Sequence, residues 1–272
     1  MKETEHCYGY WDAKNYYNVS NVQETLAQEL LSCRQWNCDE MVLDAGCGSD
    51  RVTEILSNLV PKGKVYAVDL DQNMINTAKS NLGDVKNIKF VISDISFVEL
   101  EERVDVIFSN AVIHWIADHY RLFSNFRKIL KDNGEILIQC GGKGNLRDTH
   151  RLLEKVIKKN EFSRYFTDWV TPWNFASDEE TRLILEKIGF SNIKTTLTKK
   201  IAHFSSLEEY KLFMQTAVMK PYLSYLPLDK DSSIRNAFVD AILQEKALQT
   251  KFSSLSNKWI IDYVRLNISA LY

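Results

Sequence analysis

The feature that most constrains the fold of this chain is a regular alternation of short apolar runs and helical segments between residues 41 and 142. The apolar runs read VLDAG, VYAVDL, KFVIS, VDVIFSN and EILIQC, and segments with apolar residues at helical spacing separate them. Such alternation indicates parallel strands joined by helical crossovers. Parallel strands are covered by helices on both faces, so they read as continuous apolar runs. The pattern predicts an α/β fold with a doubly wound sheet.

The second half of the chain adds two strands and a helical block. Residues 192–204 and 259–271 read as strands, and residues 206–252 are mostly helical. We therefore predict a mostly parallel seven-stranded sheet with a helical insertion before the last strand. The chain is expected to form a single domain with these parts: an N-terminal helical lid at 1–40, a ligand-binding core at 41–145, a lid segment with the sixth strand at 146–205, the insertion at 206–256 and the last strand at 257–272.

Composition excludes several classes of protein. Apolar residues make up 45% and charged residues 26% of the 272, which is ordinary for a soluble domain with a buried core. The net charge of −2 gives no electrostatic argument for binding nucleic acid, and no apolar run reaches the ~18 residues of a membrane span. The five cysteines lack paired spacing, so we expect neither a disulfide framework nor a metal site. The polar N-terminus does not read as a signal peptide, which predicts a cytoplasmic protein.

The first strand runs into a glycine-rich loop, DAGCGSDR, at residues 44–51. In open α/β sheets, ligands bind where the carboxyl ends of the strands meet. Gly46 and Gly48 would let the backbone approach a ligand closely, with the next helix N-terminus pointing at the same place. Asp69 ends the second strand, 21 residues beyond Gly48, where an acid accepts hydrogen bonds from the two hydroxyls of a ribose. Asp94 ends the third strand and suits an exocyclic amine.

This loop does not fit a dinucleotide site. The dinucleotide fingerprint requires glycine at position 51, where Arg51 stands, and Asp44 is foreign to that fingerprint. The loop instead resembles the first motif of the class I S-adenosylmethionine-dependent methyltransferases, D-x-G-x-G-x-G, which is followed by an acid that closes the second strand. The resemblance is close over residues 40–145. It implies a Rossmann-like methyltransferase fold, with S-adenosylmethionine as cofactor and S-adenosylhomocysteine as product.

Three further stretches resemble one branch of that family. They read FSNAVIHWIADHYRLF, LKDNGEILIQCGGKGN and DYVRLNISA, and they are similar to the trans-aconitate, malonyl-carrier and juvenile hormone acid methyltransferases. The resemblance implies a set of cofactor contacts that runs along the cofactor from its lid to its sulfonium end. These contacts are Tyr17 and Gln23 in the lid, Asp44, Gly46, Cys47 and Gly48 at the methionine moiety, Asp69 at the ribose, Leu70, Asp94 and Ile95 at the adenine, and Asn110 beside the sulfonium.

Asp50 stands where the family has its third glycine. Aspartate is among the best N-cap residues, worth ~1 kcal/mol, so we predict that its side chain caps the helix that follows. A carboxylate ~5 Å from a pyrophosphate would cost about 3 kcal/mol per charge pair at an effective dielectric constant near 20. The sulfonium and ammonium groups of S-adenosylmethionine would instead be attracted. Asp50 thus argues against a dinucleotide, although the lost glycine leaves a non-catalytic cofactor-binding scaffold as an alternative.

The acceptor side is expected just beyond the fourth strand. His114 and Trp115 are the candidate catalytic residues by the resemblance. His114 could act as a general base because its ordinary pKa lies near neutrality, or as a polar wall residue. The aromatic-rich run at 162–175 and the segment KPYLSYL are expected to overhang the acceptor and pack on an apolar body. The predicted substrate-binding residues are Trp115, Trp169, Trp173 and Tyr222, and the candidate cations for a carboxylate are Arg265, Lys143, Arg147 and Lys220.

These features together predict methyl transfer from S-adenosylmethionine to a small molecule, with a carboxylate oxygen of an organic acid as the favoured acceptor. Such an acid is already ionised at neutral pH, so the enzyme has only to align it behind the methyl carbon. Methylation of carbon or nitrogen in a metabolite, with His114 as base, is the alternative reaction. The protein is expected to be a monomer or homodimer that binds no nucleic acid.

Overall fold

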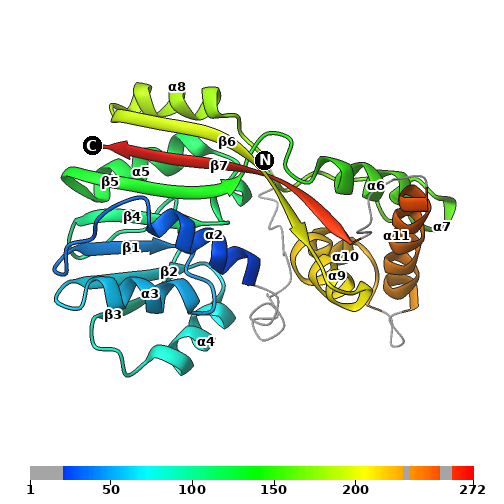
Figure 1. The fold of residues 1–272 in the computed structure, drawn as a ribbon, viewed down its shortest axis with the longest axis horizontal. Coiled ribbons are helices and arrows are strands. Elements are labelled where there is room, and N and C mark those ends of the chain that lie inside the picture. The colour runs from blue at the N-terminus through cyan, green and yellow to red at the C-terminus, as the bar shows by residue number, and fades with distance from the viewer. Residues whose placement is uncertain (1–20, 229–232, 252–258) are drawn as a thin grey trace. The chain divides into compact units, whose positions relative to one another are not determined.

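The computed structural model describes residues 21–228, 233–251 and 259–272. A seven-stranded sheet has the order β3-β2-β1-β4-β5-β7-β6 (Figure 1). Its strands are β1 (Met41–Ala45), β2 (Lys64–Asp69), β3 (Ile88–Ile92), β4 (Val104–Asn110), β5 (Leu130–Gly141), β6 (Ser191–His203) and β7 (Ile260–Leu271). Strands β1 to β5 pair in parallel, and β7 pairs with β5 in antiparallel orientation. The predicted α/β fold with a mostly parallel, doubly wound sheet is confirmed.

Helices connect these strands as the apolar spacing predicted. The chain moves outward from β1 to β2 and β3 and then returns to β4 on the other side of β1. This reversal places the carboxyl ends of β1 and β4 at the position where open α/β sheets bind ligands. The helices of the described residues are α2 (Asn21–Leu31), α3 (Arg51–Leu59), α4 (Gln72–Leu82), η1 (Ile113–Trp115), α5 (His119–Ile129), α6 (Arg147–Ile157), α7 (Asn160–Ser163), α8 (Asp178–Ile188), α9 (Leu207–Phe213), η2 (Met214–Val218), α10 (Lys220–Tyr225) and α11 (Ser233–Lys251).

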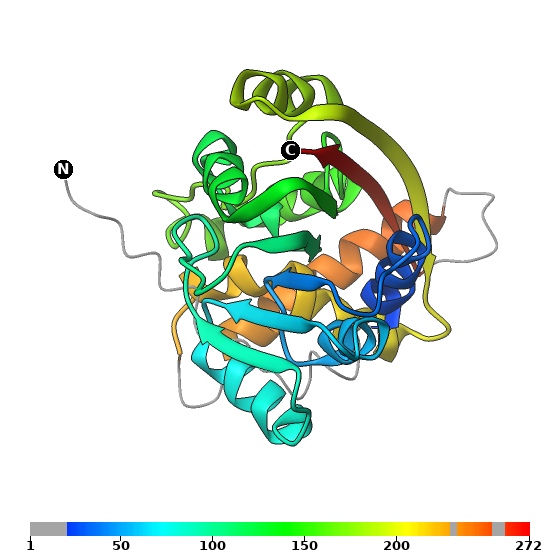
Figure 2. The same cartoon turned by 90° about the vertical axis from the view of Figure 1, so that its left-hand side faces the viewer.

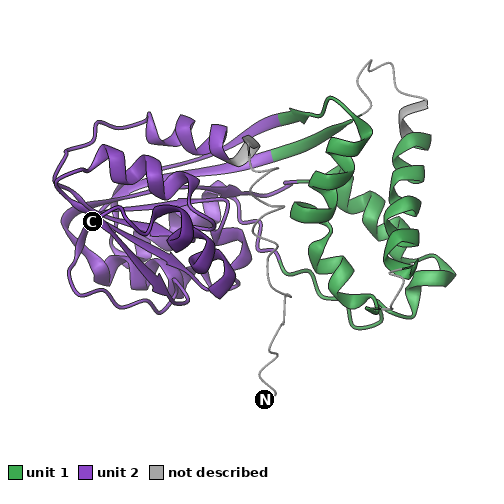
Figure 3. Ribbon diagram, turned by 90° about the horizontal axis from the view of Figure 1, so that it is seen from below, with its two compact units in different colours: residues 1–10, 146–172, 201–263 green, residues 11–145, 173–200, 264–272 purple. Residues whose placement is uncertain are grey.

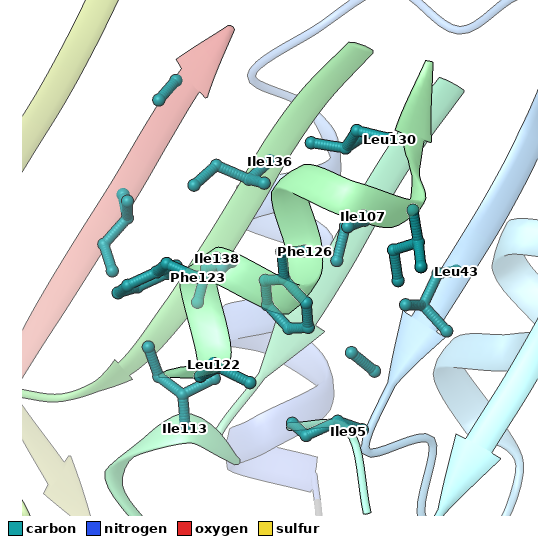
Figure 4. Packing of buried hydrophobic residues seen from close by; sticks show 14 of the residues in the cluster. Leu43, Ile95, Ile107, Ile113, Leu122, Phe123, Phe126, Leu130, Ile136 and Ile138 are labelled. Atoms are coloured by element: carbon teal, nitrogen blue, oxygen red, sulfur yellow. The ribbon is translucent and has the colours of Figure 1, made fainter. Parts of the chain in front are cut away.

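The sheet is buried on both faces. Successive residues of a strand point to opposite faces, so Val42 and Leu43 of β1 belong to different apolar clusters. Helices α5 and α8 cover the face that carries Leu43, and Phe123 and Phe126 of α5 are fully buried there (Figure 4). Helices α2 and α3 cover the opposite face (Figure 2). Burial on both faces explains the continuous apolar runs from which the fold was predicted.

Local signals fix where individual helices begin and end. At α8, the Ser177 hydroxyl accepts a hydrogen bond from the backbone N–H of Glu180, whose carboxylate accepts one from the backbone N–H of Ser177. The same helix ends at Gly189, which has a φ of +98° and so needs glycine. At α4, the Asp71 carboxylate accepts hydrogen bonds from two backbone N–H groups of the first turn. These caps hold helices that flank the carboxyl ends of the strands.

The chain divides into two compact units (Figure 3). In the described residues, one unit holds most of the sheet, with residues 21–145, 173–200 and 264–272. The other unit comprises residues 146–172 and 201–263, and it contains α6, α7 and the helices inserted between β6 and β7. Its core is aromatic, with Phe162, Phe213 and Phe238 fully buried. Among the described residues, no helix has the length and apolar character to cross a membrane.

Candidate active site

The glycine-rich loop after β1 has a backbone that only glycine adopts easily. Gly46 and Gly48 have φ values of +83° and +60°. The backbone N–H groups of Gly46 and Cys47 donate to the Val68 carbonyl of β2 at 2.8 and 2.9 Å. A side chain on Gly46 would collide with the Val112 side chain, whereas the space beside Gly48 is open to 4 Å. The loop is therefore fixed at its start and leaves room beside its second glycine.

Asp69 ties this loop to the end of β2. Its Oδ2 atom accepts a hydrogen bond from the backbone N–H of Gly48 at 2.9 Å, and its Oδ1 atom accepts one from the backbone N–H of Asp71 at 2.9 Å. Burial raises the pKa of the Asp69 carboxyl, and the two backbone donors act in the opposite direction. A carboxylate at the end of β2, next to the open side of Gly48, has the position predicted for the residue that binds a ribose.

Asp44 lies at the base of the same loop and is only 2% exposed. Its Oδ2 atom accepts a hydrogen bond from the Thr53 hydroxyl at 2.7 Å, and Thr53 belongs to α3. Burial raises the pKa of Asp44 to about 7, with a smaller contribution from the charge of Asp69. An acid with such a pKa is destabilised in its ionised form, and a nearby cation would stabilise that form.

The charges around the loop are negative. Burial raises the pKa of the Cys47 thiol well above its ordinary value, and the carboxylates of Asp44, Asp69 and Asp50 raise it further. Three acids thus act on one loop residue. Such a cluster attracts a cationic ligand and repels a phosphate. The sulfonium and ammonium of S-adenosylmethionine fit this potential.

The predicted N-cap role of Asp50 is wrong. Asp50 precedes α3, but its side chain makes no capping hydrogen bond, and its φ of +146° lies in a region that favours glycine. A capping residue needs an extended backbone to direct its oxygen at the helix, and this conformation is incompatible with that geometry. The carboxylate instead accepts a hydrogen bond from the Asn81 side chain of α4. Asp50 is 6% exposed, and burial raises the pKa of its carboxyl.

The residues predicted at the adenine lie after β2 and β3. Leu70 directly follows Asp69, and its side chain is 70% exposed. The Asp94 carboxylate accepts a hydrogen bond from the backbone N–H of Ser96 at 2.7 Å. The Ile95 side chain is buried in the apolar cluster beneath α5, so only its backbone remains available to a ligand. An exposed leucine beside two acids offers an apolar surface to a flat ring.

The carboxyl end of β4 turns sharply into η1. Asn110 is the last residue of β4, and Ala111 after it has a φ of +62°. The backbone N–H of Ala111 donates to the Gln139 carbonyl of β5 at 2.7 Å, which fixes the turn. The turn places Asn110 beside Gln139, its partner in the strand register. It also directs the chain into η1, which carries His114 and Trp115.

His114 is buried and neutral. Its side chain is 9% exposed, and the Nδ1 atom accepts a hydrogen bond from the backbone N–H of Gly141 at 3.4 Å. Burial, with smaller contributions from the positive charge of Arg265 and from His119, lowers the pKa of His114 to about 3. The general-base hypothesis assumed a pKa near neutrality, and that assumption is wrong. A ring that gains a proton only near pH 3 is uncharged at neutral pH.

Aromatic rings form a wall beside His114. The Trp115 and Trp173 rings lie 5.5 Å apart, and the Trp173 and Phe175 rings are stacked at 6.1 Å with an interplanar angle of 7°. Phe175 in turn stacks on His114 at 5.7 Å. The backbone of Asn174 donates to the His114 carbonyl at 2.8 Å, which binds the segment before α8 to η1. Two of the predicted substrate-binding residues, Trp115 and Trp173, are therefore in contact here.

The other predicted residues belong to the helical unit, are exposed, or fall outside the described residues. Trp169 and Tyr222 belong to the helical unit, where their rings stack at 4.3 Å and the Tyr222 hydroxyl lies 3.0 Å from Nδ1 of His150. Lys143 and Arg147 are exposed. The predicted lid residue Tyr17 lies outside the described residues, as does the side chain of Gln23, whose backbone belongs to the first turn of α2.

The last strand supplies a buried cation that was only one of four candidates in the sequence. Arg265 is 4% exposed, and its Nε atom donates to Oε1 of Gln139 at 3.3 Å. Gln139 donates through Nε2 to Oδ1 of Asn267 at 2.8 Å. Gln139 and Asn267 were not predicted to belong to the site, whereas Phe175 ends the aromatic-rich run at 162–175 that was expected to overhang the acceptor. A polar residue within each of the apolar strands ILIQC and VRLNI is the only signal that would have identified the first two.

Comparisons with known proteins agree with this geometry. The profile of a family described as methyltransferase domain matches residues 43–138. The malonyl-[acyl-carrier protein] O-methyltransferase of Bacillus anthracis is 30% identical over 202 residues, covering 73% of each chain. This chain belongs to the class I S-adenosylmethionine-dependent methyltransferases. It is a methyltransferase that uses S-adenosylmethionine, as the acidic glycine loop indicates.

Two further similarities lie within the same methyltransferase fold. The juvenile hormone acid O-methyltransferase of Bombyx mori is 26% identical over 216 residues, covering 77% of this chain and 76% of its own. The structure of Haemonchus contortus phosphoethanolamine N-methyltransferase 2, in complex with phosphomonomethylethanolamine and S-adenosylhomocysteine, has a TM-score of 0.59 and 18% identity. The aligned residues cover 95% of this methyltransferase and 57% of the Haemonchus contortus chain. At this identity the likeness concerns the fold alone.

Proposed function

We propose that this methyltransferase methylates a carboxylate oxygen of a small organic acid. The observation that carries the proposal is the state of His114, the titratable ring at the end of β4. With a pKa of about 3 it is a weak base at neutral pH. A carboxylic acid is already ionised there and needs no proton removed, unlike most nitrogen or carbon acceptors. Two similar proteins are named as O-methyltransferases, one of malonyl-[acyl-carrier protein] in Bacillus anthracis and one of juvenile hormone acid in Bombyx mori.

We assign the cofactor to the acidic loop. The negative charges of Asp44 and Asp69 attract the cationic groups of S-adenosylmethionine. The open space beside Gly48 lets part of the cofactor lie against the loop backbone. When bound, S-adenosylmethionine supplies a methyl carbon whose bond to sulfur breaks as an acceptor oxygen lone pair forms the new bond, so that an anion and a cation become a neutral ester and a thioether. The remaining proposed contacts are Leu70, Asp94 and Ile95 for the adenine and Asn110 beside the sulfonium, with Tyr17 and Gln23 as the lid.

The chain's own contribution to the transfer is to orient the acceptor and exclude water. The neutral ring of His114, stacked on Phe175, gives a wall that is polar at Nδ1 and otherwise apolar. Trp115 and Trp173 extend it with half-buried rings. Excluding water strengthens the attraction between an anionic acceptor and a cationic cofactor, and holding the two in line removes most of the entropic cost of their encounter.

A screen of acceptors tests this function. The protein is incubated with methyl-labelled S-adenosylmethionine and a panel of organic acids, and the products are extracted into organic solvent. We expect label in the organic phase for at least one acid, and its loss on mild alkaline treatment, because methyl esters are base-labile. Matched amines are the control. Base-stable label from an amine would establish N-methylation instead and contradict the proposal.

We also propose that the enzyme works in the cytoplasm as a monomer or homodimer, without nucleic acid. The free thiols of Cys33 and Cys38, both exposed, suit a reducing compartment. The net charge of −2 gives no general attraction to a polyanion. Light scattering of the purified protein at several concentrations distinguishes monomer from dimer.

A further inference from the structure

Arg265 is a buried cation whose Nε atom donates a hydrogen bond to the neutral amide of Gln139. It is 4% exposed and pairs with Gly141 in the register of β7 and β5. Gln139 accepts a hydrogen bond from its Nε atom at 3.3 Å and donates one to Asn267 at 2.8 Å. Residues two apart on a strand share a face of the sheet, and so do directly paired residues. Arg265, Gln139 and Asn267 thus lie on one face, and Gln139 fixes the plane of the guanidinium.

Gly141 lies between Arg265, its partner in the strand register, and the wall formed by His114 and Phe175. The backbone N–H of Gly141 donates to Nδ1 of His114 at 3.4 Å. A methyl group on Gly141 would lie 2.7 Å from Cε1 of Phe175, so that ring packs directly on the glycine. The positive charge of Arg265 also contributes to the low pKa of His114. A cation, an imidazole and an aromatic ring converge on one backbone position.

The aromatic rings beyond Phe175 form an apolar row. Trp173 stacks on Phe175, and Trp115 lies 5.5 Å from Trp173. All three rings are half-buried, so part of each remains accessible. Aromatic rings bind apolar groups through their large contact area and at low cost in side-chain entropy. A ligand that contacts both the Arg265 cation and the aromatic row would have an anionic group at one end and an apolar body at the other.

We infer that Arg265 binds the carboxylate of the methyl acceptor and that Trp115, Trp173 and Phe175 pack against an apolar chain attached to it. The inference rests on the proposed function, because it requires a carboxylic acid as acceptor. A planar guanidinium matches a carboxylate through two parallel hydrogen bonds. Each carboxylate oxygen keeps a second lone pair for bond formation. Gln139 and Asn267 are the positioning residues, and the acceptor class is the monocarboxylic acids with apolar chains.

The other cations fit this role less well. Lys143 and Arg147 are exposed, and an exposed cation attracts a carboxylate by about 1 kcal/mol or less. Arg265 has the burial that makes an ion pair with a ligand strong, since a buried charge-assisted hydrogen bond is roughly twice as strong as a neutral one.

A binding experiment tests the inference without turnover. Calorimetry compares dodecanoate with dodecan-1-ol, which has the same chain and no charge, for the wild type and Arg265→Gln. We expect the wild type to bind the acid at least tenfold more tightly than the alcohol, and Arg265→Gln to lose this preference while its affinity for the alcohol stays within twofold. Lys143→Gln, which removes an exposed cation, should behave as wild type. Equal preference in wild type and Arg265→Gln overturns the inference, as does a wild type that binds neither ligand.

A second variant separates recognition from folding. Arg265→Lys keeps the charge but not the planar fork, so it should recover part of the preference for the acid. If both Arg265 variants lose affinity for the alcohol as well, the arginine is structural and the inference is wrong. Ester formation distinguishes this failure from that of the proposed function. If no acid yields an ester with the wild type, the function itself fails, whereas equal kcat/KM in wild type and Arg265→Gln contradicts only the role of Arg265.

Discussion

At the scale of single residues, Asp44 shows a conflict between stability and binding. Its folded-state pKa of about 7 lies above the ordinary value of an aspartate in an unfolded chain. A raised carboxyl pKa stabilises the folded state only while the group is protonated. Its contribution is therefore fully present below pH ~4 and is lost as the pH rises through 7. At pH 8 the ionised Asp44 destabilises the cofactor-free protein by a few kcal/mol.

Asp44→Asn should therefore stabilise the cofactor-free protein at pH 8 and weaken cofactor binding. The amide oxygen can still accept the hydrogen bond from Thr53, so the fold is preserved. We expect the free energy of unfolding to rise by about 2 kcal/mol at pH 8 and hardly at pH 4, and the affinity for S-adenosylmethionine to fall at least tenfold because a charge is lost. Urea denaturation at both pH values and calorimetry measure this. An equal gain at both pH values would show that Asp44 does not titrate in this range.

Asp50 allows a test of backbone strain. A non-glycine residue at φ +146° costs of the order of 1–3 kcal/mol, and among the described residues the buried Oδ1 atom of Asp50 has no hydrogen-bond partner. Asp50→Gly removes both penalties and should raise the free energy of unfolding by about 1 kcal/mol, after the entropic cost of glycine. Asp50→Ala is the matched control, because it removes the carboxylate and keeps the strain. Urea denaturation should rank Gly above Ala, and equal stabilities would exclude strain as the cause.

These residues also mark how far the site could be predicted from sequence. The glycine loop with Asp44 and Asp69 is a local motif, so the positions of these residues could be predicted from the amino-acid sequence alone. The error at Asp50 has a physical cause: N-cap preference assumes an extended backbone, whereas the loop imposes a conformation suited to glycine. The error about the pKa of His114 arose because the burial and the Arg265 charge that lower it come from distant parts of the chain. Local pattern predicts positions, and tertiary contacts set ionisation.

At the scale of elements, the strands were predictable because burial on both faces requires continuous apolar runs, which are visible in the sequence. The pairing of β5 with β7 was harder to predict, because the two strands are far apart in sequence and antiparallel within a mostly parallel sheet. That pairing brings Gln139 and Asn267 together and places Arg265 opposite Gly141. The grouping of Gln139, Asn267 and Arg265 thus depends on the register between β5 and β7, which no single stretch of sequence specifies.

The end of β5 gives a prediction about the acceptor side. In Gly141→Ala, the added methyl group would lie 2.7 Å from both Cε1 of Phe175 and Nδ2 of Asn145, so the aromatic ring must shift. We expect KM for an acid substrate to rise at least fivefold, with the affinity for S-adenosylmethionine unchanged, because the glycine loop is on other strands. Gly142→Ala is not a suitable control, since Leu266 packs on that glycine. Lys143→Ala, which alters an exposed neighbour, should leave both constants unchanged.

At the scale of the whole molecule, the two compact units share continuous strands. Strands β6 and β7 each begin in one unit and end in the other, since the boundaries at residues 200 and 263 fall inside them. Each unit also contains a histidine whose pKa is lowered by burial. His114 in the sheet unit has a pKa of about 3, and His150 in the helical unit, whose Nδ1 atom lies 3.0 Å from the Tyr222 hydroxyl, has a pKa lowered to about 4 by burial.

These two histidines report whether the units unfold together. A base with a depressed folded-state pKa contributes stability above its unfolded pKa of ~6.5, and that stability is lost as the pH falls toward the folded value. Between pH 7.5 and 5, His150 should cost the wild type about 2 kcal/mol, and His114 a similar amount. His150→Gln and His114→Gln should each reduce the pH dependence of unfolding by about that much. If continuous strands make unfolding a single transition, both variants change the same urea curve, followed by tryptophan fluorescence and by circular dichroism. Two separate transitions, each sensitive to one histidine, would show that the units unfold independently.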